Sequence, residues 1–363
     1  MSDKRYLGNI ITQNPTAPTD NYETTSAAGV WSLAEAFAYT KAGLWPTAGN
    51  AVPRALFAGG RGTASPVNKD VIDYVTITTT GNATDFGDLT SLTQELGAFS
   101  SSSRAVFFGG QAVASGSGQG TVTNVMAYVT IASAGNATDF GDLTAANAQS
   151  PAGVSSSTRG VRGGGRDPNI GPVNTMDYVT IASTGNATDF GDLLTTTNSL
   201  SSCNSSTRGI FSGGAVGSGP TNVIQYITIA SVGNAIDFGD LSTVLYQAAS
   251  GIVSSSTRGI VNMGGRDASN YVPTIEYVTI ATTGNSTDFG DLTVSVRESA
   301  SASSTVRGLA AGGLPGSGVT SEAVDNIQYI TITSTGNSSD FGDLTLARYR
   351  FAGASNAHGG LAA

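Results

Sequence analysis

One 16-residue phrase recurs six times along the chain, and its spacing constrains the fold more than any other feature. The copy at residues 178–193 reads YVTIASTGNATDFGDL. The Asp-Phe-Gly-Asp-Leu core of the six copies begins at Asp85, Asp139, Asp189, Asp237, Asp288 and Asp340. The mean interval is about 51 residues, which is the length of one small supersecondary unit. Because such a unit cannot bury a core alone, the copies are expected to pack on one another.

Each unit is predicted to contain four antiparallel strands. In the third unit, residues 175–183 (TMDYVTIAS) are rich in β-branched and aromatic side chains, as strands are. The turn signal TGN at 184–186 separates them from a returning strand at 187–193. Upstream, residues 155–165 (SSSTRGVRGGG) form a short strand that glycines close. Segments rich in Ala, Ser and Gly, such as 246–256 (YQAASGIVSSS), supply the remaining strand.

The predicted fold class is all-β, with small sheets packed radially as a β-propeller, an arrangement that protects strand edges. The first unit begins near residues 52–60 (VPRALFAGG). The C-terminal residues 347–363 (ARYRFAGASNAHGGLAA) are expected to form the first two strands of a further unit that stops short. The C-terminal strands are therefore expected to complete the blade that the N-terminal strands begin. Six blades fit the six copies, and seven would require N-terminal residues to supply the missing strands.

The phenylalanine of each copy is predicted to be structural, packing one blade on the next. Repeated large apolar residues usually form core. The alternative is a row of aromatic residues that stack on a ligand. The six residues are Phe86, Phe140, Phe190, Phe238, Phe289 and Phe341.

The unit resembles kelch-type β-propeller repeats in its length, in the Gly-Gly that ends one strand and in the aromatic residue late in the unit. It departs from them in carrying Phe where kelch units usually carry Trp. The phrase YVTIASTGNATDFGDL, together with SSSTRGxxxGG, is similar to repeat proteins of tailed bacteriophages, particularly those of marine bacteria. Residues 29–50 (GVWSLAEAFAYTKAGLWPTAGN) resemble an N-terminal segment of phage structural proteins. The resemblance implies a tail fibre or another virion structural protein.

Residues 1–50 contain no repeat and are predicted to form an extended arm and a short helix, whereas residues 51–363 form the propeller. Ser32 and Glu35 match a capping box, and Gly43 suits a helix C-terminus. The apolar residues of this segment are candidates for a virion anchor, although the helix would also suit simple packing on the propeller. These residues are Trp31, Leu33, Phe37, Tyr39 and Trp45.

Composition excludes several classes of function. The net charge is −9 and the sequence pI is near 4.5, so the basic surface typical of nucleic-acid binding is absent. No run of about 18 apolar residues predicts a membrane span, and the start lacks the apolar core of a signal peptide. His358 is the sole histidine and Cys203 the sole cysteine, which excludes multi-histidine metal centres. No cofactor and no enzymatic activity are predicted.

Two repeated charged features have structural and functional interpretations. One arginine recurs in each unit, and we expect it to pair with a repeated aspartate; a ring of arginines that binds an anion is the alternative. The paired aspartates, such as Asp189 and Asp192, are expected to cap turns, and a Ca²⁺ site is the alternative. The arginines are Arg54, Arg104, Arg159, Arg208, Arg258 and Arg307.

The copies differ most in the connection that follows Gly-Gly. Equivalent loops of a propeller project from one face, and variable loops on a rigid scaffold commonly form binding surfaces. Neutral variation of tolerant loops is the alternative. The candidate binding-loop residues are Asn68, Gln111, Arg166, Asp167, Asn169, Arg266, Asp267, Asn270 and Tyr271.

Three functions follow from these features. The first is a non-enzymatic virion module, a tail fibre or receptor-binding protein, that is attached to other virion proteins by its arm and presents its loops to a host-surface glycan or protein. The second is a capsid decoration or appendage protein without a receptor. The third is a glycan-cleaving enzyme, for which no converging acid pair is evident outside the repeated turns. The first two place the protein on the virion, without nucleic-acid binding or membrane insertion, and are compatible with a homo-oligomer.

Overall fold

A computed structural model describes residues 52–63, 67–113, 120–146, 148–246, 250–267, 270–316 and 322–361. The chain divides into two compact parts, Met1–Pro53 and Arg54–Ala363, and the fold is described for the second part. Within the described residues the fold is all-β, with antiparallel sheets, as the sequence predicts. The helical residues described there belong to a short 3-10 turn, η1 (Gly359–Leu361).

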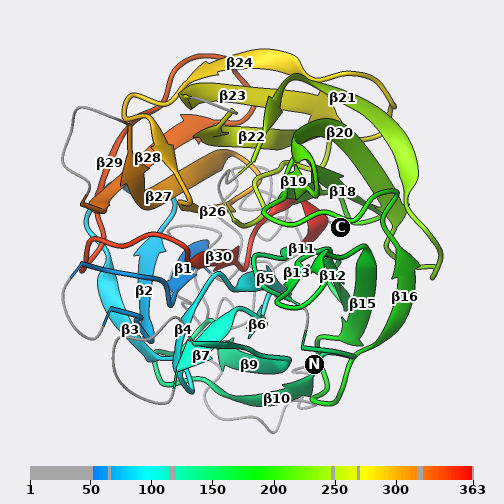
Figure 1. Ribbon diagram of the computed structural model, residues 1–363. Helices are drawn as coiled ribbons and strands as arrows, with labels where there is room; N and C mark the ends of the chain where they lie inside the picture. The colour runs from blue at the N-terminus through cyan, green and yellow to red at the C-terminus, as the bar shows by residue number, and fades with distance from the viewer. Residues whose placement is uncertain are drawn as a thin grey trace, which may run out of the picture. The chain divides into compact units, whose positions relative to one another are not determined.

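Four strands recur in each unit. The first is a short strand rich in Ala, Ser and Gly, which we call the central strand because it lies near the middle of Figure 1. The central strands are β5 (Gly97–Ser100), β11 (Ala152–Ser155), β17 (Ser201–Asn204), β26 (Ala300–Ser303) and β30 (Ala352–Ser355). In one unit this place is taken by residues 252–255, where Ser254 forms a single bridge with Gly259. Every residue of the five central strands is buried, because small side chains let neighbouring backbones approach closely.

The second and third strands of each unit pair with each other. The second strands are β1 (Arg54–Ala58), β6 (Arg104–Phe108), β12 (Arg159–Gly163), β18 (Arg208–Ser212), β22 (Arg258–Arg266) and β27 (Arg307–Pro315). The third strands are β2 (Val71–Thr76), β9 (Val125–Thr130), β15 (Thr175–Thr180), β20 (Gly219–Thr228), β23 (Tyr271–Thr279) and β28 (Val324–Thr331).

The outer strands carry the Asp-Phe-Gly-Asp sequence. They are β3 (Thr84–Asp88), β10 (Thr138–Asp142), β16 (Thr188–Asp192), β21 (Ile236–Leu245), β24 (Thr287–Asp291) and β29 (Ser339–Asp343). Short strands occupy the connections: β4 (Leu92–Gln94), β7 (Gln111–Val113), β8 (Thr121–Val122), β13 (Arg166–Asp167), β14 (Gly171–Pro172), β19 (Ala215–Val216) and β25 (Val296–Arg297). Figure 1 shows the central strands near the middle of the picture and the outer strands at its periphery.

The outer strand of each unit bonds to the next unit through its backbone. Phe86 lies at a bulge in the pairing of β2 with β3, so its carbonyl is turned away from its own sheet. That carbonyl accepts a hydrogen bond from Gly135 N of the second unit at 2.7 Å, and the Asp88 carbonyl accepts one from Ala137 N at 2.7 Å. The Asn136 side chain returns a bond, since its Oδ1 accepts from Asp88 N at 3.1 Å.

The same bonds recur at all six junctions, and the series closes on itself. At the last junction Gly81 N donates to the Phe341 carbonyl and Asp343 N donates to Asn82 Oδ1. The Asn side chain of each Gly-Asn turn therefore accepts a hydrogen bond from the outer strand of the neighbouring unit. Asn234 does the same, although it is followed by Ala-Ile and so is not in an Asn-x-Ser/Thr glycosylation sequence. This bond explains why all six copies keep Gly-Asn.

Phenylalanine, tyrosine and arginine form a layer beneath each junction. Phe86 is 2 % exposed and packs with Val129 and Ile131 of the next unit, while the Tyr74 ring meets its edge at 5.9 Å. The equivalent clusters each combine residues of two consecutive units, and the one around Phe341 includes Val75 and Ile77 of the first unit. The six phenylalanines thus lie in the core.

The prediction that the repeated arginines pair with aspartates is wrong. The Arg159 guanidinium lies over the Tyr178 ring at 4.4 Å, and its Nη1 donates to the carbonyls of Ile229 and Ala230 in the next unit. The other five arginines stack on the equivalent tyrosine and reach the equivalent carbonyl. A planar cation suits this role because it stacks and donates at once.

The first and last strands of the Arg54–Ala363 part meet in one sheet, whose order is β3-β2-β1-β30. Strand β30 pairs with β1, as expected for a C-terminal strand that completes the first sheet. A buried ion pair supports this junction: Arg348 Nη1 lies 2.9 Å from Asp73 Oδ2, and both side chains are 0 % exposed. The C-terminal segment supplies one strand rather than the expected two, since the chain then turns into η1.

The C-terminal segment closes one end of the space between the central strands. Residues at the ends of these strands bond to neighbouring units; for example, Ser355 Oγ donates to the Ser303 carbonyl and Ser100 Oγ donates to the Ser355 carbonyl. His358 is fully buried there. Gly360 N donates to its Nδ1, so Nε2 carries the proton, and it faces Ser155 Oγ at 3.3 Å.

A pair of glycine substitutions tests the junction. A Cβ on Gly141 would lie 2.5 Å from the Gly185 carbonyl oxygen, whereas a Cβ on Gly185 would meet nothing within 4 Å. Both residues have positive φ. We expect Gly141→Ala to lower the free energy of unfolding by about 2–4 kcal/mol and Gly185→Ala by about 1 kcal/mol, measured by denaturant unfolding. Equal losses would show that φ alone, and not the contact, requires the Asp-Phe-Gly glycine.

A second prediction concerns pH. Burial lowers the pKa of His358 to about 4, although a backbone contact at Ser100 acts in the opposite direction. Below about pH 6.5 the unfolded chain takes up a proton that the folded imidazole accepts only near pH 4. The free energy of unfolding should therefore fall between these values, by at most about 3 kcal/mol. The variant His358→Gln should lose less stability over the same interval, and parallel curves would contradict the assignment.

Candidate functional site

The variable connections of the six units begin on one side of the sheets. After Gly-Gly, each connection runs beside the segment that leads into the central strand of its own sheet. The contacts that fix this arrangement are Arg61–Tyr349, Gln94–Gln111, Gln149–Arg166, Asn198–Ala215, Tyr246–Arg266 and Arg297–Leu314. We call this side the loop face. The opposite strand ends carry the Gly-Asn turns, which all six copies keep, and the turns before the repeated arginines, which are rich in Ser and Thr in five copies.

Most of the predicted loop residues lie on the loop face, with different degrees of exposure. Asn68 is 0 % exposed, so the prediction of a surface contact for it is wrong. Gln111 is half-buried and accepts from Gln94 Nε2 at 3.0 Å. Arg166 and Asn169 are exposed, and Asp167 Oδ1 holds their turn by accepting from Asn169 N at 2.7 Å.

A second group of predicted residues lies near the fifth unit. Asp267 Oδ1 accepts from the backbone of exposed Asn270. Arg266 is half-buried, with its guanidinium 5.9 Å from the Tyr246 ring centre. The Tyr271 hydroxyl accepts from Arg297 Nε at 3.1 Å. The predicted anchor residues Trp31, Leu33, Phe37, Tyr39 and Trp45 lie outside the described residues.

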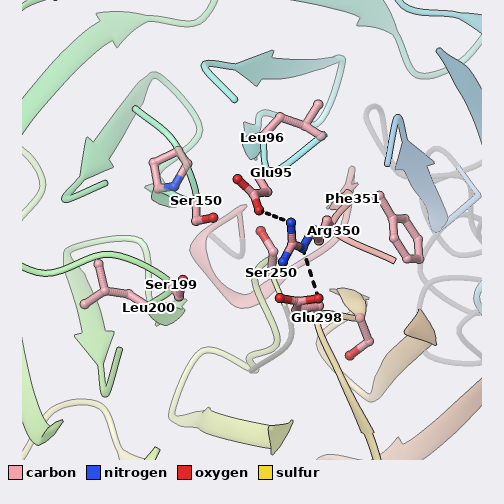
Figure 2. Close-up of a pocket in the computed structure, with 11 residues that line it drawn as sticks. Glu95, Leu96, Ser150, Ser199, Leu200, Ser250, Glu298, Arg350 and Phe351 are labelled. Carbon is pink, nitrogen blue, oxygen red and sulfur yellow. Dashed lines mark ion pairs between the residues drawn. The ribbon is translucent and has the colours of Figure 1, made fainter. Parts of the chain in front are cut away.

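A small pocket opens between the segments that lead into the central strands. Figure 2 shows Arg350 between Glu95 and Glu298, with Ser250 next to Arg350, Ser150 near Glu95, and Ser199 farther away beside Leu200. Apolar residues close the base. The lining residues are Glu95, Leu96, Ser150, Pro151, Ser199, Leu200, Ser250, Glu298, Ser299, Arg350 and Phe351. The pocket thus combines charged groups, hydroxyls and an apolar base, and it lies on the same side as the variable loops.

Five of these residues have left-handed backbone conformations. The φ angles are 58° for Glu95, 51° for Ser150, 57° for Ser199, 55° for Glu298 and 60° for Arg350. Their backbones bond in series: Ser199 N donates to the Ser150 carbonyl, Ser150 N to that of Glu95, Glu95 N to that of Arg350, and Arg350 N to that of Glu298. Five different units therefore present a side chain from the same backbone position.

Ion pairs fix the charged groups of the pocket. Arg350 Nη1 lies 2.6 Å from Glu95 Oε1, and Arg350 Nε lies 3.1 Å from Glu298 Oε2. Burial alone would lower the pKa of Arg350, but the adjacent carboxylates of Glu298 and Glu95 outweigh it and raise that pKa. Arg297 adds a pair with Glu298 at 2.9 Å. Two carboxylates and two guanidiniums therefore hold one another in place.

The sequence reasoning missed the pocket residues. It compared the copies only after Gly-Gly and within the repeated phrase, whereas the pocket residues precede each central strand. A signal was available there. The position two residues before the central strand is Glu, Ser, Ser, Glu and Arg in the five copies, whereas the central strand itself consists mainly of small residues in every copy. The converging geometry required the tertiary structure.

The described residues offer little for nucleophilic or metal chemistry. Cys203 is fully buried, and burial raises the pKa of its thiol. Across the described ranges, no group of three or more His, Cys, Asp and Glu side chains could hold a metal ion. The same part of the chain contains no helix that is long and apolar enough to cross a membrane.

In comparisons with known proteins, no family model matches the chain and no curated protein matches it either. The geometry and chemistry of the loop face and the pocket are therefore the basis for a functional proposal.

The left-handed serines provide a test of this geometry. Glycine adopts positive φ without the steric penalty of a side chain. We expect Ser150→Gly and Ser199→Gly each to raise the free energy of unfolding by about 0.5–1 kcal/mol, measured by thermal or denaturant unfolding. The control is Ser157→Gly, at an exposed position without a positive φ, which should lower stability. Destabilisation by the first two variants would contradict the backbone assignment.

Proposed function

We propose that residues 54–361 form a six-bladed β-propeller of the kelch-like class. Six sheets follow one another in sequence, and each outer strand bonds to the next unit. The bonds from the sixth unit to the first support a closed set of six. The pairing of β30 with β1 supports closure of the first blade by the C-terminal strand, without a seventh blade.

We further propose that the protein is a non-enzymatic binding module whose loop face contacts a glycan or protein on a host surface. The observation that carries this proposal is the segregation of variation. The connections that differ in length and content all begin on one side, around the pocket, whereas the turns at the opposite ends are nearly identical. Rigid strands with variable loops on one face commonly form binding sites.

In this proposal, residues 1–50 attach the module to other virion proteins of a tailed phage. The repeated phrase and residues 29–50 support this placement through their resemblance to phage proteins. Attachment through a separate N-terminal segment leaves the loops available for a receptor.

The enzymatic alternative has less support. A glycoside hydrolase requires a carboxylic acid that is free to donate its proton and a second carboxylate at a suitable distance. Glu95 and Glu298 both engage the guanidinium of Arg350. The sole histidine is buried at the opposite end of the central strands, where it cannot serve the loop face.

Adsorption of the purified, fluorescently labelled full chain to host bacteria tests the binding function. In one variant, residues 166–174 (RDPNIGPVN) are replaced by the shorter connection at 215–222 (AVGSGPTN), which the same type of unit already accommodates. We expect adsorption to fall at least about tenfold, a loss of roughly 1.4 kcal/mol. The control Ser157→Ala changes the invariant opposite side and should adsorb normally. Equal adsorption of all three proteins would contradict binding through the loop face.

Immunogold electron microscopy of intact particles tests the placement, with antibody raised to residues 54–361. We expect gold at the tail tip or fibres. Gold spread over the capsid would favour the decoration protein instead, and particles without gold would contradict a virion protein of either kind.

A further inference from the structure

We propose that the pocket around Arg350 binds one neutral sugar residue of a glycan. This inference rests on the proposed binding function of the loop face and specifies its ligand class as carbohydrate rather than protein. It follows from the charge balance of the pocket, its hydrogen-bonding groups and the conformational strain at its lining residues.

The charges of the pocket balance without a ligand. Glu95 and Glu298 are opposed by Arg350 and Arg297, and all four groups are joined by ion pairs of 2.6–3.1 Å. The two glutamate side chains are only 7–8 % exposed. A charged ligand would leave one of these buried groups without its partner, which is costly. A neutral ligand leaves the ion pairs intact.

The pocket nevertheless offers hydrogen-bonding groups of both kinds. A guanidinium has five N–H donors and each carboxylate has about four acceptor positions, so the ion pairs do not exhaust them. Arg350 is the most accessible charged group, with 27 % of its side chain exposed. Ser150, Ser199 and Ser250 are half-buried and also line the pocket, with Ser250 drawn next to Arg350 in Figure 2. Sugar hydroxyls both donate and accept, which matches this mixed set.

The base and the rim suit the apolar faces of sugar rings. Leu96, Leu200 and Phe351 are buried apolar residues of the pocket lining. Near the pocket, half-buried Tyr271 and Tyr349 are held by arginines at 5.5 and 5.6 Å from their ring centres. These rings offer flat surfaces for neighbouring residues of a longer glycan.

Strain at the lining residues indicates that their side chains matter. A non-glycine residue at positive φ costs about 1–2 kcal/mol, yet five units keep polar or charged side chains there. The chain contains 48 glycines and uses them at other positive-φ positions. A purely structural backbone turn would be better served by glycine. Strained residues with converging polar groups are typical of ligand sites.

The test measures binding of methyl glycosides of glucose, galactose, mannose, rhamnose and N-acetylglucosamine to the full chain by ligand-detected NMR titration. For a single sugar residue we expect a Kd on the order of millimolar for at least one of them. Arg350→Lys keeps the charge but removes the planar fork, and should weaken binding about tenfold. The control Ser157→Ala, at an exposed position on the opposite side, should leave Kd within about twofold.

A second variant guards against a folding defect. Ser150→Gly combined with Ser199→Gly removes two hydroxyls at positions where glycine favours the fold, and should weaken binding about threefold to tenfold. N-acetylneuraminic acid and glucosamine serve as charged probes and should bind at least about tenfold more weakly than the best neutral glycoside.

The outcomes separate this inference from the proposed function. Adsorption to host cells without binding of any neutral glycoside would overturn the sugar site and leave the loop-face function standing. Tighter binding of a charged probe, or equal binding by the Arg350→Lys and Ser157→Ala variants, would also overturn it. Failure of both adsorption and glycoside binding would overturn both proposals.

Discussion

The structure depends on a backbone contact between consecutive units. The phenylalanine carbonyl of each outer strand is turned out of its own sheet by a bulge and accepts a hydrogen bond from the next unit. The close approach leaves no room for a Cβ on the following glycine, and it satisfies polar groups that an outer strand would otherwise expose. The repeated phrase therefore supplies the residues that form one junction between units, and the six junctions require six copies.

The layer beneath the junction is part of the hydrophobic core. Phenylalanine and tyrosine meet edge to face, and arginine covers the tyrosine ring while bonding to carbonyls of the next unit. One side chain thereby joins two units without burying an ion pair, which would require a matched partner in every copy. Two units do contain buried pairs, Arg162–Asp177 and Arg348–Asp73, and the second ties the C-terminal segment to the first sheet.

This frame gives the two ends of the central strands different characters. At one end the C-terminal segment fills the space, with a neutral histidine and closely packed glycines. At the other end five left-handed residues from different units direct side chains into one pocket. The repeats are similar enough to close, and the few positions that differ are collected beside one another. Variation among the copies is concentrated at these positions because the close backbone contacts at the junctions leave no room for added side-chain atoms.

The sequence by itself determined the all-β class, the strand pattern of the unit and the burial of the repeated phenylalanines. These follow from local alternation, turn residues and an internal period, which are properties of neighbouring residues. The sequence analysis predicted the wrong partners for the repeated arginines. Matching each arginine with an aspartate of the same repeat could not show that it stacks on a tyrosine ring and donates to a carbonyl of the next unit.

Only the tertiary structure decided that Glu95, Glu298 and Arg350 meet. They are separated by 52 or more residues in sequence and belong to different units. Their convergence depends on the positive φ that each adopts before its central strand and on the junctions that bring those strands together. The sequence period predicts the number of units. The pocket forms because the packing of the units brings together equivalent positions that carry different side chains.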